Sequence, residues 1–451
     1  MAKRCKHSEE ATDATGEDLL SALPDAVLQV VLSFLPSDET VRTCVLSRRW
    51  RHLWKSTPAL RITRGGRRFL EWRAWTVNNF VNQLLLLRDR LPLDECEISI
   101  SEEFYNADED ELFRFADTWI RHAVSLCKAR VLKVRIRTES YSLPLVNVPF
   151  ISQFLVRVEL TDVILLPRSL DFSNCPALED LRMCSCRIYA RRIISQSLRR
   201  LSITSCDFRW KSRTCISTPC LVSFELEDID GRAPLLESMP SLVTAFVRLD
   251  YSCNDTCRHK ACGDCGDDRC FGQYDGSAGS NRSVLLRGLS GATNLELTCD
   301  PEVFIFRKDC KQCPTFTMLK TLLLNEWCVA ADFGILVCFL QHTPLLENLT
   351  LQLEPREQPA VETDESYNPA EQLLLLKHLK VVEIKCFKED EVVHKIVAML
   401  NTFGVLPEKI DIEQNFFPPP RSKFNNITRH DSLILIFVLT AVSKCWNRKN
   451  Y

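Results

Sequence analysis

The segments LEDLRMCSCRI (residues 178–188) and LRRLSITSCDF (residues 198–208) decide the fold of this chain of 451 residues. Each carries large apolar residues at its first, fourth, sixth and eleventh positions and a cysteine, Cys186 or Cys206, at its ninth. At that place the side chain can satisfy inner backbone groups and turn the chain off a strand. A pattern that returns at constant spacing indicates a repeat architecture, in which each unit buries its apolar side chains against its neighbours.

Weaker copies of this spacing flank the two segments. In chain order they are Val131, Val134, Ile136; Leu155, Val158, Leu160; Leu221, Phe224, Leu226; Leu242, Ala245, Val247; Ala292, Leu295, Leu297; Leu319, Leu322, Leu324; Leu346, Leu349, Leu351; and Leu379, Val382, Ile384. The separations fall mostly in the leucine-rich-repeat range, roughly 20–29 residues. We therefore predict an α/β fold: a leucine-rich-repeat solenoid over residues 129–375, whose parallel strands form a concave binding face. An ordinary α/β domain is the alternative, but it leaves the ninth-place cysteines unexplained.

The amino-terminal region carries apolar residues at helical spacing. Pro24 suits a helix start, because its missing N–H would be unpaired there in any case. One helix face follows at i, i+3, i+4 and i+7, formed by Leu28, Val31, Leu32 and Leu35. A second helix is predicted after Pro36, and a third with Trp50, Leu53 and Trp54 on one face. Three short helices over residues 18–60 do not bury all these groups on their own, which indicates a partner surface or a cap on a larger domain.

These residues also resemble a known family. Leu23-Pro24-Asp25, Leu35-Pro36 and the run VLSRRWRHLW (residues 45–54) resemble a plant-type F-box in sequence and spacing. The resemblance implies that the module binds the Skp adaptor, and through it the cullin scaffold of an SCF ubiquitin ligase. It assigns that contact to Leu23, Pro24, Leu28, Leu32, Leu35, Pro36, Val45, Leu46, Trp50, Leu53 and Trp54, some of which must instead hold the three helices together.

The resemblance continues along the chain. Residues 84–100, 289–297 and 322–353 are similar to plant F-box/leucine-rich-repeat proteins, and residues 376–412 resemble the FBD region that often ends them. We expect residues 61–128 to be a helical linker or cap, since Trp75, Phe80, Phe115 and Trp119 fall at helical spacings. Residues 1–17 are polar and expected to be disordered. Residues 413–451 form an irregular tail to which we assign no function.

A polar insertion at residues 251–285 interrupts the repeats. It holds Cys253, Cys257, Cys262, Cys265 and Cys270, with His259 among them. Four thiolates can hold zinc tetrahedrally, which makes Cys253, Cys257, Cys262 and Cys265 candidate ligands. A second two-residue knuckle is missing, and Cys310-Lys-Gln-Cys313 supplies it only if the loop folds back. A loop of reduced thiols is the simpler interpretation, a redox dithiol is a third, and we expect no cofactor.

Composition and motifs argue against several functions. The net charge of −2 favours neither nucleic acid nor an anionic membrane. No apolar run reaches the roughly 18 residues of a membrane-spanning helix, and residues 1–18 lack the apolar core of a secretory signal. We therefore expect nuclear or cytoplasmic localisation, or both, with the 22 cysteines reduced and most of them packed in the core. No glycine-rich phosphate loop or H-E-x-x-H string is present, so we do not expect an enzyme.

The expected function is that of a substrate-recognition adaptor of an SCF-type ubiquitin ligase. On this interpretation the amino-terminal module binds the Skp adaptor and the repeats bind the target protein. The alternative is a leucine-rich-repeat recognition or scaffold protein that does not support ubiquitination. The sequence identifies neither the target nor the positions that contact it.

Overall fold

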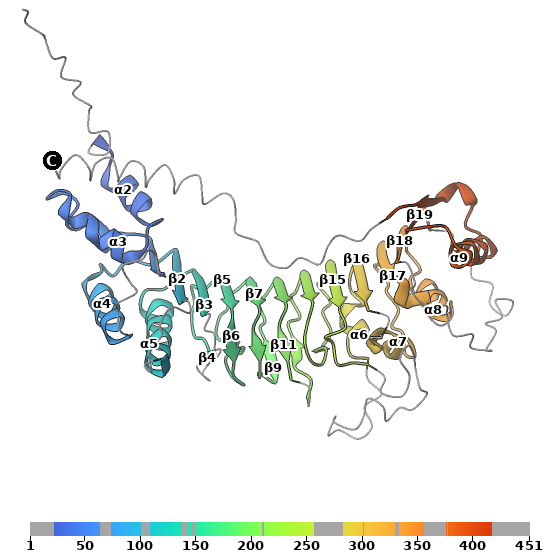
Figure 1. Ribbon diagram of the computed structural model, residues 1–451, viewed down its shortest axis with the longest axis horizontal. Coiled ribbons are helices and arrows are strands. Elements are labelled where there is room, and N and C mark those ends of the chain that lie inside the picture. The colour runs from blue at the N-terminus through green and yellow to red at the C-terminus, as the bar shows by residue number, and fades with distance from the viewer. Residues whose placement is uncertain are drawn as a thin grey trace, which may run out of the picture.

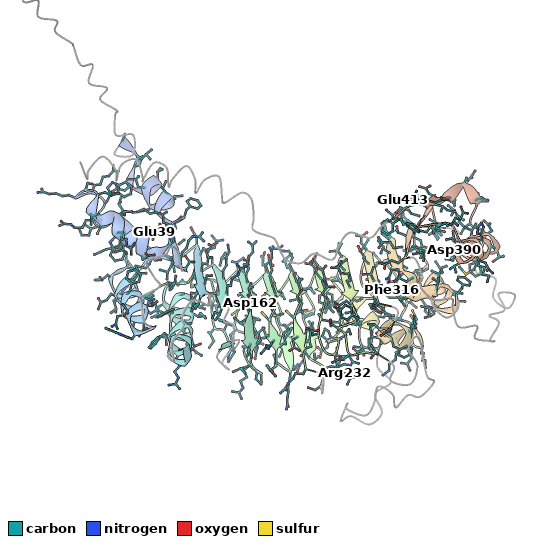
Figure 2. The ribbon with its side chains drawn as sticks, in the orientation of Figure 1. Glu39, Asp162, Arg232, Phe316, Asp390 and Glu413 are labelled. Carbon is teal, nitrogen blue, oxygen red and sulfur yellow. The ribbon has the colours of Figure 1, made fainter. Side chains whose placement is uncertain are left out.

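The structure is a computed structural model that describes residues 22–63, 74–100, 109–136, 143–145, 149–209, 212–256, 283–300, 302–329, 333–354, 376 and 378–416. These residues form an elongated arch with a long sheet running along its inner side (Figure 1). Figure 2 places Glu39 and Glu413 at opposite ends of that arch. The expected disordered residues 1–17 and the tail from residue 417 onward lie outside the described residues.

Within the described residues the main sheet has 13 strands. They lie in the sheet in the order in which they occur in the chain, and each is parallel to its neighbours. They are β1 (Ala59–Thr63), β2 (Glu95–Ile100), β3 (Val131–Ile136), β5 (Arg157–Thr161), β7 (Asp180–Cys184), β10 (Arg200–Thr204), β13 (Ser223–Glu227), β15 (Thr244–Leu249), β16 (Asn294–Cys299), β17 (Thr321–Asn325), β18 (Asn348–Leu353), β19 (Val381–Cys386) and β20 (Ile410–Glu413). The predicted α/β fold with a parallel strand face is confirmed.

The register of the strands follows the repeat phase read from the sequence. Leu181 pairs with Leu201, and Met183 pairs with Ile203. All four side chains are buried, and the residues between them lie on the concave face. Stacking identical positions in this way buries a continuous apolar core that no single repeat could form alone.

The ninth-place cysteines act on the backbone as predicted. The Cys186 thiol donates to the carbonyl oxygens of Leu160 and Cys184, at 3.4 and 3.3 Å. The Cys206 sulfur accepts the main-chain N–H of Cys186 at 3.4 Å, and its thiol lies 3.4 Å from the Thr204 carbonyl oxygen. These bonds satisfy main-chain groups where the chain leaves the strand. The turn after each of β5, β7, β10 and β13 uses a left-handed residue, at Asp162, Ser185, Ser205 and Asp228.

The segments that return between strands change character along the arch. At the N-terminal end they include α4 (Ala74–Leu87) and α5 (Glu109–Arg121). In the middle they form two small parallel sheets: β4 (Leu143–Leu145), β6 (Val163–Leu165), β8 (Arg187–Ile188) and β11 (Asp207–Phe208), then β9 (Arg192–Ile194), β12 (Cys215–Ser217) and β14 (Leu235–Leu236). Beyond them lie α6 (Leu286–Leu289), α7 (Ile305–Cys310), α8 (Gly334–His342) and α9 (Glu391–Thr402) (Figure 1).

The sheet begins earlier than expected. Residues 61–128 are not simply a helical linker, because β2 lies within them and β1 pairs with it directly. Helices α4 and α5 therefore precede and follow a strand of the solenoid. The alternating burial of Cys96, Ile98 and Ile100 is a strand pattern that the helical spacing of the flanking aromatic residues obscured. At the other end, β19, α9 and β20 continue the same sheet through residues 376–412.

In the described part of the amino-terminal module, two α-helices have defined bounds, where the first two helices were predicted. They are α2 (Asp25–Leu32) and α3 (Ser37–Arg42), followed by the short 3-10 turns η1 (Thr43–Val45) and η2 (Leu53–Ser56). The third predicted helix was wrong, because Ser47 lies in irregular chain and Trp50 in a turn before η2. Such a short segment gains little from helix formation, and packing of Trp50 and Leu53 decides its path instead. None of the helices in the described part of the chain is long and apolar enough to cross a membrane.

Candidate partner-docking site

The amino-terminal module has a small apolar core of its own. Its buried members are Leu28, Leu32, Leu35, Trp50 and Leu53, with Leu23 and Leu46 packed against them. Leu28 and Leu32 come from α2, while Trp50 and Leu53 come from the turns that pass beneath it. Because these side chains already contact one another, they hold the module together and are not available to a partner in the free chain.

Polar contacts fix the path of the chain around this core. The Thr40 hydroxyl donates to the carbonyl oxygens of Leu32 and Pro36, at 3.1 and 3.0 Å, which holds α3 against the end of α2. The Arg49 guanidinium pairs with Asp25 at 2.6 Å, and Asp25 is the first residue of α2. The second contact is exposed to solvent and therefore contributes little energy, so its main effect is to orient the turn.

A second apolar face of α2 points to solvent. Val27 and Val30 of α2 are 43% and 49% exposed, and Phe34, in the turn directly after α2, is 37% exposed and continues their helical spacing. We call these three residues the α2 stripe. Val45, 77% exposed, lies in the following turn. Exposed apolar groups on a module whose core is already filled indicate a surface that another protein covers.

The module is joined firmly to the solenoid through Arg61 of β1. The Arg61 main-chain N–H donates to the Ser37 hydroxyl at 3.0 Å, and its Nε donates to the Ser33 carbonyl oxygen at 2.8 Å. Its guanidinium also pairs with Glu95 of β2 at 2.8 Å. Through its main chain and its side chain, this one residue thus connects α3 and the end of α2 with the first two strands of the sheet.

A second connection lies on the other side of β1. Arg88, which follows α4 and is buried, donates to the Thr57 hydroxyl at 3.0 Å and to the Thr57 carbonyl oxygen at 2.6 Å. Trp54 belongs to the core of the solenoid rather than to that of the module. Figure 1 shows α2 and α3 at the end of the arch, beside the first strands. These contacts give the module a fixed orientation relative to the concave face.

The structure sorts the residues that the F-box resemblance assigned to the contact. Leu28, Leu32, Leu35, Trp50 and Leu53 form the core of the module, and Trp54 joins the core of the solenoid; Leu23, Pro36 and Leu46 are half-buried; Pro24 and Val45 are exposed. Reasoning from the sequence missed the α2 stripe. Val27, Val30 and Phe34 also follow helical spacing in the sequence. The prediction assigned the apolar face of this helix to the leucines, so this second face received no role.

The concave face carries charges of alternating sign at its N-terminal end. Arg61, Glu97, Lys133, Glu159 and Arg182 lie in register on successive strands. Opposite charges on neighbouring strands stabilise one another and leave little net field. Asp180, two residues before Arg182 on β7, is buried. Its carboxylate is contacted by Arg157, Arg182 and Arg200, at 3.1, 3.2 and 3.3 Å.

The row of residues in register with Arg61 and Arg182, which we call the central row, becomes acidic and apolar on the later strands. From β13 to β17 it reads Glu225, Phe246, Glu296 and Leu323, all half-buried. Burial raises the pKa of Glu296, and Glu227 in the adjacent row raises it further, while Arg248 lowers it. Acidic groups crowded beside apolar ones are suited to a partner that brings basic and apolar side chains.

A pocket of about 210 Å³ lies near the C-terminal end of this face, lined by Glu326, Leu353, Glu354 and Asp390 among others. Glu326 is 7% exposed, and its burial raises the pKa of the carboxyl to about 7. A carboxyl group held in its neutral form at this depth can donate a hydrogen bond as well as accept one.

The candidate zinc ligands of the insertion are not brought together in the described residues. Cys253 is fully buried beside Asp255, and burial raises the pKa of its thiol to about 12. Cys257, Cys262 and Cys265 lie outside the described residues, so zinc in the insertion stays a prediction. All the cysteines that the structure describes are free thiols.

Comparisons with known proteins agree with this geometry. A family model for the F-box domain matches residues 20–61. The chain is 29% identical to the meiotic F-box protein MOF of Oryza sativa subsp. japonica, over 74% of this chain and 71% of that protein. It is 26% identical to an F-box/FBD/LRR-repeat protein of Arabidopsis thaliana, over 75% of this chain and 72% of that protein. The amino-terminal module is an F-box domain, and the resemblance to plant F-box/FBD/leucine-rich-repeat proteins is confirmed.

Proposed function

We propose that this F-box protein is the substrate-recognition adaptor of an SCF-type ubiquitin ligase. Its F-box domain binds the Skp adaptor, and through it the cullin scaffold, while the solenoid binds the target protein. The observation that carries this proposal is the α2 stripe, formed by Val27, Val30 and Phe34. These apolar side chains are exposed although the core of the domain is complete without them, so their burial requires a partner.

The mechanism is one of positioning. Arg61, Arg88 and Trp54 attach the F-box domain to the first strands of the sheet. A target on the concave face is therefore carried at a fixed distance from the ligase core. Tethering makes the encounter between target and ubiquitin-loaded enzyme effectively intramolecular. The chain itself supplies binding and orientation, and other subunits supply the chemistry.

We further propose that the target lies on the C-terminal half of the concave face. Between β13 and β17 the half-buried groups of this face include the apolar side chains of Phe246 and Leu323 beside Glu225 and Glu296. The N-terminal half carries an alternating row of charges that stabilise one another. Apolar side chains with acidic neighbours provide contact area together with selection for a basic partner.

The proposed location is the nucleus, the cytoplasm or both.

Reconstitution with a purified Skp adaptor, cullin scaffold, ubiquitin-activating and ubiquitin-conjugating enzymes tests the adaptor function. We expect the full chain to join the Skp–cullin complex on size-exclusion chromatography and to undergo ubiquitination of its own lysines. A Val27→Asp/Phe34→Asp variant should remain folded, because both side chains are exposed, but should not join the complex. Omitting the cullin is the matched control for ubiquitin transfer.

Two results would contradict the proposal. If the folded chain does not bind the Skp adaptor, the docking function fails. If it binds but no cullin-dependent ubiquitin transfer follows, the chain is a recognition or scaffold protein that does not support ubiquitination.

A further inference from the structure

Three cysteines and one histidine converge on the helical side of the solenoid, away from the F-box domain. Cys310 is the last residue of α7, and Cys313 lies three residues after it. Cys338 and His342 lie one turn apart on α8. The ligand atoms of Cys313, Cys338 and His342 all lie within 4.8 Å of one another. Within the residues that the structure describes, no other group of three or more such side chains meets this closely.

Cys310 lies beside this group. Its Sγ is not among the ligand atoms that all lie within 4.8 Å of one another, and it would complete a four-ligand set by a movement of its side chain. The Cys338 thiol also lies 3.5 Å from the Cys310 carbonyl oxygen and 3.8 Å from Nδ1 of His342. All four residues are half-buried, so an ion could enter the cluster and still be shielded by protein.

We propose that Cys310, Cys313, Cys338 and His342 bind one structural zinc ion. Three thiolates and one imidazole are a common closed, four-coordinate ligand set for zinc, and thiolates disfavour magnesium and calcium. The spacing is C-x2-C followed by C-x3-H, as in zinc knuckles and fingers. Bond lengths of about 2.0–2.3 Å place ligand atoms about 3.3–3.8 Å apart in a tetrahedron, so the ligand atoms that lie furthest apart must close by about 1 Å.

The site would join two consecutive repeats. Cys310 and Cys313 follow β16, whereas Cys338 and His342 follow β17. Figure 1 shows α7 and α8 as neighbouring return helices. Their ends are already linked, because the Phe316 main-chain N–H donates to the His342 carbonyl oxygen at 2.8 Å and the Phe316 ring stacks on Phe339 at 5.8 Å. Zinc would connect α7 and α8 through coordinate bonds, and its binding energy would contribute to folding.

This site differs from the one considered in the insertion. The insertion set was Cys253, Cys257, Cys262 and Cys265, with Cys310 and Cys313 as a distant supplement. The structure instead brings the Cys313 thiol beside Cys338 and His342 of α8, and the Cys338 thiol also contacts the Cys310 carbonyl oxygen. No sequence motif announces this pairing, because 24 residues separate Cys313 from Cys338.

The test is the zinc content of the full chain, purified under reducing conditions without a metal-affinity column. Elemental analysis and native mass spectrometry should find one zinc ion per chain. A Cys338→Ser/His342→Ala variant should retain less than about a tenth of it. Two control variants should retain it in full: Cys215→Ser/Cys220→Ser, which removes thiols elsewhere on the surface, and Cys257→Ser/Cys262→Ser/Cys265→Ser in the insertion.

A spectroscopic measurement keeps the test independent of stability. Cobalt(II) added to the metal-free chain should give the intense visible bands of a tetrahedral thiolate site. A conservative His342→Cys variant should keep those bands with a shifted maximum, which a purely structural defect would not produce. Loss of zinc in the insertion variant but not in the Cys338→Ser/His342→Ala variant would overturn the proposal. So would a fully reduced, folded wild-type chain that takes up neither metal.

Discussion

Asp255 shows how single residues far apart in sequence stabilise the middle of the arch. Its carboxylate is fully buried and accepts hydrogen bonds from Arg213 at 2.7 and 2.8 Å and from the Ala233 main-chain N–H at 2.9 Å. Arg232 adds a contact at 3.4 Å. Burial on its own raises the pKa of Asp255, but the two guanidiniums and these hydrogen bonds outweigh it, so the pKa lies below 3.8. The carboxylate is therefore ionised wherever the chain is folded near neutral pH.

We predict that Asp255→Asn lowers the free energy of unfolding by about 3–5 kcal/mol at pH 7, because two buried guanidiniums lose their counter-charge. A depressed pKa gives stability that is present above pH 3.8 and lost as the pH falls through the folded value. The difference between wild type and variant should therefore shrink in acid. Chemical denaturation at several pH values measures it, with exposed Asp94→Asn as the control. Equal losses at both positions would contradict this account.

Glu326 has the opposite shift and predicts the opposite pH dependence. Burial raises its pKa from 4.5 to about 7, so the folded chain holds this proton more tightly than the unfolded chain does. That contribution is present below pH 4.5 and is lost as the pH rises through about 7. Glu326→Gln should raise the free energy of unfolding at pH 8 by on the order of 3 kcal/mol and have little effect at pH 4.

The melting temperature of wild type and Glu326→Gln across this pH range provides the measurement. Exposed Glu302→Gln is the control and should change nothing. A variant that melts at the same temperature as wild type at pH 8 would show that Glu326 is ionised there without penalty.

Among single residues, the sequence predicted the roles of those whose role depends on their position within the repeat. The ninth-place Cys186 and Cys206 bond to the backbone as expected, because their position in the repeat fixes their neighbours. The Asp255 cluster was not predictable. Its partner Arg213 lies 42 residues away, and only the stacking of repeats brings the two charges together.

Among the elements, α2 carries two apolar faces with different roles. Leu28 and Leu32 point into the domain core, and the α2 stripe of Val27, Val30 and Phe34 points to solvent. Helical spacing predicted the first face correctly. Periodicity could not assign the second, because it shows which residues share a face and not which face is covered.

We predict that Leu28→Ala destabilises the F-box domain by about 2–5 kcal/mol, since it leaves a cavity in a small core. Val27→Ala, on the neighbouring exposed face, should cost less than about 0.5 kcal/mol. Hydrogen exchange of the amides of α2 and α3 in the full chain separates the two effects locally. Similar exchange rates in both variants would contradict the division of α2 into a core face and an open face.

The third predicted helix and the unpredicted strands β1 and β2 share one cause. The third helix was predicted from apolar residues at helical spacing, and residues 61–128 were predicted to be helical from the spacing of their aromatic residues, whereas tertiary contacts decided the local structure. Trp50 and Leu53 are held in turns by the domain core, and β2 is held in the sheet by its neighbours β1 and β3. Short segments of low intrinsic preference follow such contacts rather than their own periodicity.

On the scale of the whole molecule, the net charge does not show how the charges are distributed over the concave face. A net charge of −2 describes neither half of the concave face, since alternating charges fill one half and acidic and apolar groups occupy the other. Repeat phase predicted the arch and its parallel sheet. It did not predict how the F-box domain is attached, because Arg61 and Arg88 act through single side chains outside the repeat pattern.

We predict that Arg61→Ala loosens the F-box domain from the sheet without unfolding either part, because it removes contacts to Ser33 and Glu95. Spin labels on α3 and on β10 should show a broader distance distribution in the variant than in wild type. Arg135→Ala, at an exposed position of the same sheet, is the control. An unchanged distribution would show that Trp54 and Arg88 suffice to fix the orientation.

The central claim, that the α2 stripe docks the Skp adaptor, is tested most directly by calorimetric measurement of that affinity for three full-length chains. Wild type should bind, and Val30→Asp should bind at least about tenfold more weakly, a loss of about 1.4 kcal/mol or more. Val243→Asp places the same substitution at an exposed valine of the solenoid and should bind as wild type does. Equal binding by wild type and Val30→Asp, or no binding by the folded wild-type chain, would contradict the account.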